Sequence, residues 1–253
     1  MNIKIISCLN DNYSYLIHDD LSKKTAIIDP SEFAPCDKAI NKNYKKLDFI
    51  LNTHHHHDHV GGNEELKKKY NAKILGFEND KNRIPGIDKV LRDNQEFKIG
   101  TLNFTTIFIP GHTKGHIAFY FKKEKVVFTG DTLFSLGCGR VFEGTYEQMF
   151  QSLNKLKNLP GDTKVYCGHE YTYKNLEFCL KFNPNNDFLK KKKNIVELTL
   201  KNKKPTIPST IEEEIKTNIF FRFNSPDVKK AINLENSSDI EIFTKLRELK
   251  DNF

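Results

Sequence analysis

Four segments of this chain share one design, in which an apolar run is followed directly by a side chain that can bind a metal ion. They read FILNTHHHHDH, TTIFIPGHTKGH, VVFTGDTLF and VYCGHEYT. Short runs of β-branched and aromatic residues predict buried strands, and ligand sites are commonly built from strand ends and the loops just after them. We therefore expect side chains from all four segments to converge at one edge of a sheet.

The first segment places five of the nine histidines within residues 54 to 59. In an extended chain, successive side chains point to opposite sides, so three of these residues face one side and two histidines face the other. The first group is His54, His56 and Asp58, and the intervening pair is His55 and His57. His59 can join the first group because the chain must turn at the two glycines that follow. The run is internal, so it is not an expression tag, and a tract that binds metal loosely is the alternative.

The other three segments contribute His112, Asp131 and His169. Together with the first segment they supply five imidazoles and two carboxylates. Seven ligands are too many for one tetrahedral metal but suit two metals, with one bridging carboxylate and an open position for water at each. This thiolate-free, imidazole-rich set fits zinc, iron or manganese better than calcium or magnesium. Taken singly, each residue would more often be a cap or a turn residue; their joint occurrence predicts a metal site.

Length and composition favour a folded globular protein. A chain of 253 residues buries roughly three quarters of its unfolded surface, and 38% hydrophobic with 11% aromatic residues argues against disorder. No apolar run approaches the roughly 20 residues that span a bilayer. The opening residues MNIKIISCLNDNYSYLI are strand-like rather than a signal or transit sequence. We predict a cytoplasmic protein without membrane association.

Three smaller expectations concern individual residues. The five cysteines form an odd count without CxxC spacing, so we expect small buried residues rather than disulfides or a thiolate zinc site. His18 has no companion motif and is expected at the surface or in a turn. His116, in GHTKGH, is expected to play a structural role beside the ligands.

The chain changes character near Tyr171. Before it, strands are predicted at 4–6, 13–17, 25–28, 49–52, 73–75, 104–109, 117–121, 126–129 and 164–166, and helices at 37–43, 62–70 and 146–158. After it come charged amphipathic helical segments broken by prolines, with no convincing strand. We therefore predict an α/β metal-binding domain at 1–172 and a smaller helical domain at 173–253.

In this order, THHHHDH, GHTKGH, TGDTLF and CGHE resemble the metallo-β-lactamase superfamily from about Met1 to Tyr171. The resemblance implies an α/β fold, an αββα sandwich with the metals along one edge. It also implies that one metal is held by His54, His56 and His112 and the other by Asp58, His59 and His169, with Asp131 bridging. Asp29 matches an acidic position that supports the histidine loop in this superfamily, although an ordinary Asp-Pro turn explains it equally well.

The segments LFSLGCGRVFEGT, CGHEYT and RELKDNF narrow the resemblance to the glyoxalase II (hydroxyacylglutathione hydrolase) family. The positions matching that family's glutathione contacts are Arg140, Phe142, Tyr171, Arg247 and Lys250. Cations suit glutathione because it carries two carboxylates. Two positions depart from the common pattern: Phe142 stands where many members have Tyr, and Arg140 where Lys is common.

The resemblance implies a metal-dependent thioester hydrolase acting on S-D-lactoylglutathione. A metal-bound hydroxide would attack the thioester carbonyl, with Asp58 and Asp131 as the catalytic carboxylates and Asp58 orienting the water or accepting its proton. The products would be D-lactate and glutathione, the second step of methylglyoxal detoxification. The substrate is then the one small-molecule partner, and no obligatory protein partner is evident.

Two other enzyme activities are alternatives to thioester hydrolysis. A glutathione-persulfide dioxygenase would share the metal motifs but use a single iron. A nucleic-acid-processing hydrolase is suggested by the net charge of +7 and by the run LKKKKN at 189–194. That run lacks interleaved aromatic residues and is typical of a solvated helix face, so no nucleic-acid partner is predicted.

Overall fold

The computed structural model describes all 253 residues. They form two compact units, residues 1–108 with 114–130 (unit 1) and residues 109–113 with 131–253 (unit 2). None of the helices combines the length and apolar character that crossing a bilayer would require.

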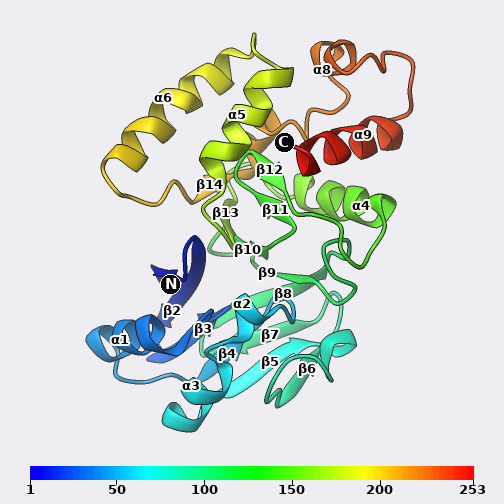
Figure 1. The fold of residues 1–253 in the computed structure, drawn as a ribbon. Helices are drawn as coiled ribbons and strands as arrows, with labels where there is room; N and C mark the ends of the chain where they lie inside the picture. Colours follow the sequence, from blue (N-terminus) through cyan, green and yellow to red (C-terminus); the bar gives the residue numbers. More distant parts are fainter. The chain divides into compact units, whose positions relative to one another are not determined.

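Unit 1 contains a six-stranded sheet whose strands follow the order of the chain (Figure 1). The strands are β1 (Asn2–Cys8), β2 (Asn12–Asp19), β3 (Lys24–Ile28), β4 (Phe49–Leu51), β5 (Lys73–Phe77) and β6 (Lys89–Leu91). The first three pair antiparallel, and β3 to β6 run parallel. Parallel strands bring their carboxyl ends to one edge, so the loops after β3 and β4 emerge there together.

Two helices pack with this sheet, α1 (Phe33–Asn43) and α3 (Asn63–Tyr70). Their buried apolar side chains, such as Ile40 and Leu66, join Leu16, Ile27 and Ile50 of the strands in one core cluster. The cluster fixes where α1 and α3 lie, and therefore where the chain connecting β4 to α3 must pass. That connection contains the histidine run.

The second sheet of unit 1 is an antiparallel meander of β7 (Glu96–Ile99), β8 (Leu102–Phe108), β9 (Ile117–Phe121) and β10 (Val126–Gly130). Aromatic side chains join it to the first sheet, since the rings of Tyr15 and Phe128 lie 5.2 Å apart and those of Phe77 and Phe108 lie 4.7 Å apart. Unit 1 is thus a helix layer on two face-packed sheets.

Unit 2 is mostly helical, with α4 (Tyr146–Lys157), α5 (Thr172–Phe182), α6 (Asp187–Lys201), α7 (Ile211–Thr217), α8 (Pro226–Ala231) and α9 (Asp239–Asp251). Its strands are short: β11 (Leu133–Phe134) pairs with β12 (Gly137–Cys138), and β13 (Lys164–Cys167) with β14 (Ser209–Thr210). Capping boxes at Thr145 and Ser238 satisfy the first amides of α4 and α9. Both helices therefore begin where the sequence supplies a cap.

The nine predicted strands and three predicted helices are all present, with ends displaced by a few residues. The strands β6, β7, β11, β12 and β14 were not predicted, because two to four residues are too few to show a period. All five cysteines are buried and free, as predicted.

The prediction for His18 was wrong. Its side chain is 7% exposed, its ring stacks on Tyr44 at 3.9 Å, and its Nδ1 lies 2.9 Å from the Thr25 hydroxyl. A strand residue facing a helix is buried by tertiary packing that no local motif reveals.

Candidate metal centre

The histidine run lies in unit 1 between β4 and the short helix α2 (His57–Val60). Residues 52 to 56 form an irregular loop, and His54 and His59 are fully buried. The His54 and His56 rings lie 4.7 Å apart, whereas His57 is exposed. The expected extended alternation does not continue through Asp58, because residues 57 to 60 form a helix.

Asp29 connects the end of β3 to this loop. Its carboxylate accepts hydrogen bonds from the Thr53 amide (2.8 Å) and hydroxyl (2.6 Å), and lies 3.2 Å from His59 Nδ1. Asp29, His54 and His59 offer one ligand atom each within 4.8 Å of one another. Asp29 has a φ of +47°, a backbone conformation that Asp tolerates better than most residues. The contacts are those of a residue that orients a histidine.

Asp58 begins the first turn of α2 and its side chain is 39% exposed. Its Oδ2 lies 3.5 Å from His59 Nε2 and accepts a 3.0 Å hydrogen bond from Asn12 Nδ2, which also donates to the Asp58 backbone carbonyl. Asn12 was not singled out in the sequence, where an Asn before a strand looks like any turn residue. It fixes the carboxylate beside His59.

The other three expected ligands, His112, Asp131 and His169, lie together in unit 2. Asp131 Oδ2 lies 3.5 Å from His112 Nε2 and 3.2 Å from His169 Nε2, and all three side chains are at most 8% exposed. Two imidazoles facing one carboxylate oxygen form a compact donor set. An added Cβ at Gly139 would come within 1.9 Å of the Asp131 carbonyl oxygen, so only glycine allows the backbone at position 139 to pass this close to Asp131.

The histidines share an orientation that suits metal binding. Nδ1 of His112 lies 2.9 Å from the Arg140 carbonyl, which can only accept, and Nδ1 of His59 faces Asp29. A proton on Nδ1 places the lone pair on Nε2, next to Asp131 and Asp58 respectively. Histidine ligands are typically held by such outer contacts, which set the tautomer and the ring direction. The orientation of these histidines therefore fits the binding of divalent metal ions.

Two of the expected substrate contacts pack against metal-candidate histidines of unit 2. The Tyr171 ring stacks on His169 at 4.7 Å with an interplanar angle of 5°, and the Phe142 ring lies 5.2 Å from His112. Phe142 is 63% exposed, an unusual position for a large apolar side chain. Both aromatic rings thus border the His112, Asp131 and His169 group.

The three expected cations differ in their surroundings. Arg140 and Arg247 share Asp251, whose Oδ1 lies 3.3 Å from Arg140 Nε and 2.9 Å from Arg247 Nη2. The Arg140 side chain is 58% exposed, but Arg247 is almost wholly buried and also donates to the Cys138 carbonyl at 2.6 Å. Asp251 was not singled out in the sequence, although its i+4 spacing from Arg247 was a signal for it.

Lys250 is half-buried on α9. Its ammonium lies 3.2 Å from the Lys174 carbonyl and above the rings of Phe178 and Phe253. Burial, together with repulsion from the neighbouring Arg247, lowers the pKa of Lys250 to about 8. Its charge is therefore lost within an accessible pH range.

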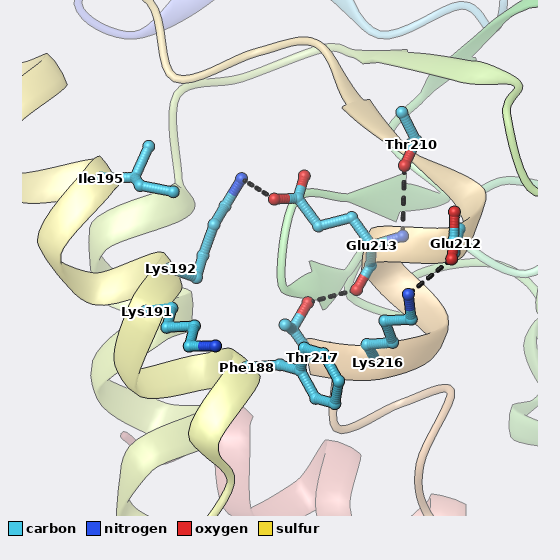
Figure 2. A pocket seen from close by; sticks show the side chains of 9 residues that line it. All are labelled: Phe188, Lys191, Lys192, Ile195, Thr210, Glu212, Glu213, Lys216 and Thr217. Atoms are coloured by element: carbon cyan, nitrogen blue, oxygen red, sulfur yellow. Dashed lines mark hydrogen bonds and ion pairs between the residues drawn. The ribbon is translucent and has the colours of Figure 1, made fainter.

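A cavity of about 370 Å³ lies between α6 and α7, and none of the expected site residues lines it. Figure 2 shows its polar floor, where Lys192 reaches Glu213 at 2.9 Å and the Thr217 hydroxyl donates to the Glu213 carbonyl at 2.6 Å. Lys192 belongs to the basic run that was expected to be solvated, yet it is buried. Its neighbours Lys190, Lys191 and Lys193 are exposed as expected.

Comparison with known proteins places the chain in a family. Residues 10–169 match the metallo-β-lactamase superfamily, and residues 170–253 match the hydroxyacylglutathione hydrolase C-terminus. The hydroxyacylglutathione hydrolase of Pelagibacter ubique is 51% identical over 253 residues, covering 100% of both chains. That of Methylococcus capsulatus is 43% identical, covering 100% of this chain and 99% of its own.

The chain belongs to the hydroxyacylglutathione hydrolase family of the metallo-β-lactamase superfamily. Among solved structures it is similar to ETHE1 from Myxococcus xanthus, with a TM-score of 0.68 and 23% identity over 96% of this chain and 95% of that one. It is also similar to TTHA1623 in a di-iron-bound form, with a TM-score of 0.56 and 26% identity over 67% and 92%. The predicted metallo-β-lactamase fold with a helical C-terminal domain is confirmed, and the His and Asp clusters of this hydroxyacylglutathione hydrolase family member are compatible with a binuclear metal site.

Proposed function

We propose that this protein hydrolyses the thioester bond of 2-hydroxyacylglutathiones, S-D-lactoylglutathione foremost, to give D-lactate and glutathione. The observation that carries the proposal is the full-length identity of 51% to a relative named hydroxyacylglutathione hydrolase. We propose that this reaction is the second step of methylglyoxal detoxification and that the protein acts in the cytoplasm. The matching C-terminal family profile supports this substrate class over others handled by the same superfamily.

We further propose that the chain holds two divalent metal ions, with zinc preferred and iron and manganese also suited to the donor set. One ion would be held by His54, His56 and His112, the other by Asp58, His59 and His169, and Asp131 would bridge them. When bound, such a pair lowers the pKa of a water molecule and polarises a carbonyl. The buried imidazoles oriented through Nδ1 and the di-iron form of TTHA1623 support this assignment.

The chain's own groups would then handle the proton. Asp58, held by Asn12 beside His59, is the carboxylate we assign to accept a proton from the attacking water. The water oxygen forms the new bond to the acyl carbon, the carbon–sulfur bond breaks, and glutathione leaves as a thiolate. A thiolate is a comparatively good leaving group, so no strong acid is needed.

Glutathione binding is assigned to residues that all lie in unit 2: Arg140, Phe142, Tyr171, Arg247 and Lys250. The domain at residues 1–172 would thus supply the metal ligands, and the domain at 173–253 would supply Arg247 and Lys250. The backbone carbonyl of Arg140 contacts His112 Nδ1, so an expected substrate residue touches an expected metal ligand 28 positions away in the chain. Arg140 and Lys250 would contact the glutathione carboxylates directly, whereas buried Arg247 would act by fixing α9.

The pKa of Lys250 predicts a pH dependence of substrate binding. Because this pKa is about 8, the cation is present at pH 7 and lost as the pH rises through 8. We expect KM to rise about tenfold between pH 7 and 9.5, the size of one lost charge-assisted hydrogen bond. Inhibition constants of S-methylglutathione across this range check the prediction, because this analogue does not hydrolyse. Lys250→Arg should flatten the profile, and an unchanged profile in that variant would contradict the assignment.

The proposed activity is tested by the thioester absorbance of S-D-lactoylglutathione at neutral pH. Matched samples would retain their metal, be stripped of it, and be stripped and then resupplied with zinc. We expect rapid loss with metal, at least about a hundredfold slower loss without it, and recovery on resupply. No turnover in a sample with two metals per chain would reject this substrate, and oxygen uptake with glutathione persulfide would be measured next.

A further inference from the structure

We propose that Asp80 and Arg83 are positioning residues for the metal-binding loop, acting through His55. This inference rests on the proposed metal centre but not on the proposed substrate. Asp80 ends the short helix after β5 (Glu78–Asp80), and its side chain is fully buried. Burying a carboxylate costs free energy unless the carboxylate is paired, so the partners of Asp80 indicate its role.

The side chains of His55, Asp80 and Arg83 contact one another within unit 1. Arg83 donates Nε–H (3.1 Å) and Nη2–H (2.5 Å) to Asp80 Oδ1, and its Nη1 lies 3.3 Å from His55 Nε2. His55 Nδ1 lies 3.4 Å from Asp80 Oδ2. A guanidinium can only donate, so His55 Nε2 must accept and the ring proton must be on Nδ1, facing Asp80. The Nδ1–Oδ2 approach is an ion-pair contact without hydrogen-bond geometry, so Asp80 is tied to His55 chiefly through Arg83.

His55 stands between two expected ligands, His54 and His56. Backbone hydrogen bonds hold the start of the loop, from the Asn52 amide to the Leu75 carbonyl and from the Ile117 amide to the Thr53 carbonyl. Side-chain contacts at His55 add an anchor further along the loop. The His55 ring lies 4.9 Å from the His56 ring and 6.5 Å from the His54 ring. Anchoring His55 therefore restrains the backbone on which both expected ligands are carried.

The network also reaches His54 by a second route. An added Cβ at Gly115 would come within 1.9 Å of Asp80 Oδ1, so Asp80 packs directly against the backbone before His116. The His116 ring stacks on His54 at 4.6 Å with an interplanar angle of 22°. Asp80 thus supports His54 through the chain at His55 and through the ring of His116.

The test is the zinc affinity of Asp80→Asn, measured by competition with a chelator of known affinity and by metal content at limiting free zinc. We expect zinc affinity to fall between about tenfold and a hundredfold, the usual effect of losing an outer-shell partner. Bound zinc at limiting supply should fall from two ions per chain towards one. With saturating zinc, kcat should recover and KM should stay unchanged, because the ligands and the substrate contacts remain.

Glu78→Gln is the matched control, since Glu78 lies in the same short helix and pairs with Arg92 but is exposed. It should bind zinc like the unaltered protein. Gly115→Ala, which crowds Asp80 from the other side, should lower zinc affinity in the same direction and serves if Asp80→Asn fails to fold. Unaltered zinc affinity in a folded Asp80→Asn, or loss of stability in the metal-free protein without recovery by zinc, would overturn the proposal. Because zinc binding is measured without substrate, failure of the proposed thioesterase activity would be seen separately.

Discussion

Replacing Asp131 by Asn should reduce kcat/KM at least about a thousandfold while the protein stays folded. Asp131 Oδ2 lies within 3.5 Å of both His112 Nε2 and His169 Nε2, so its charge faces two expected ligands. The amide keeps the size of the side chain but removes the negative charge that two cations would share. Metal-ion stabilisation is worth several kcal/mol, and each 1.36 kcal/mol is a factor of ten in rate.

Turnover, zinc content and thermal unfolding of the metal-free protein would be measured on the same preparations. The melting temperature should change by only a few degrees, because Asp131 is not part of an apolar core. Asp187→Asn is the control, an exposed aspartate of the same unit that pairs only with Lys190. An Asp131→Asn protein with two zinc ions and full turnover would contradict the bridging assignment.

Replacing Arg247 by Ala should destabilise unit 2 by about 3 kcal/mol, the low end for breaking a buried charge pair. The Arg247 guanidinium is 3% exposed, donates to the Cys138 carbonyl and to Asp251, and lies 5.2 Å from the Phe220 ring. It therefore fastens α9 to β12. Its loss leaves a buried carbonyl without its donor and releases the helix that carries Lys250.

Urea unfolding followed by far-UV circular dichroism would measure the stability, and S-methylglutathione inhibition would measure binding. We expect both to weaken in Arg247→Ala, whereas Lys245→Ala, an exposed lysine on the same helix, should change neither. A variant with unaltered stability and weakened binding would assign Arg247 to substrate contact alone. A variant with reduced stability and unaltered binding would leave Arg140 and Lys250 as the cations that bind glutathione.

Local patterns were sufficient for most of the strands and for the residue types of the candidate site. Alternation and β-branched runs depend on neighbours in sequence, and they located β1 to β5, β8 to β10 and β13. The spacing of His54, His56, Asp58 and His59 is equally local. Even the Asp80 network follows the same design, since an acid follows the apolar run KILGF, but without a partner in sequence it carried no signal.

Contacts between distant residues could not be predicted in this way. Asp29 and Thr53 are 24 positions apart, Arg247 and Cys138 are 109 apart, and Arg140 and Asp251 are 111 apart. Whether a cation is solvated or buried depends on what packs over it. For this reason the sequence did not predict the burial of Arg247, which it assigned to glutathione contact, and His18 proved to be a core residue.

The sequence by itself determined the family, because its motifs resemble those of known members. It also predicted most of the strands and a set of candidate donor side chains, because these follow from periodicity and spacing. Only the tertiary structure decided which nitrogen each histidine directs outward, which carboxylates hold the loops, and which arginine is buried. Those properties arise when strands and helices far apart in the chain pack together. Hydrogen bonds to Asp29, Arg140 and Asp80 form only then, and they turn a list of ligand residues into an oriented site.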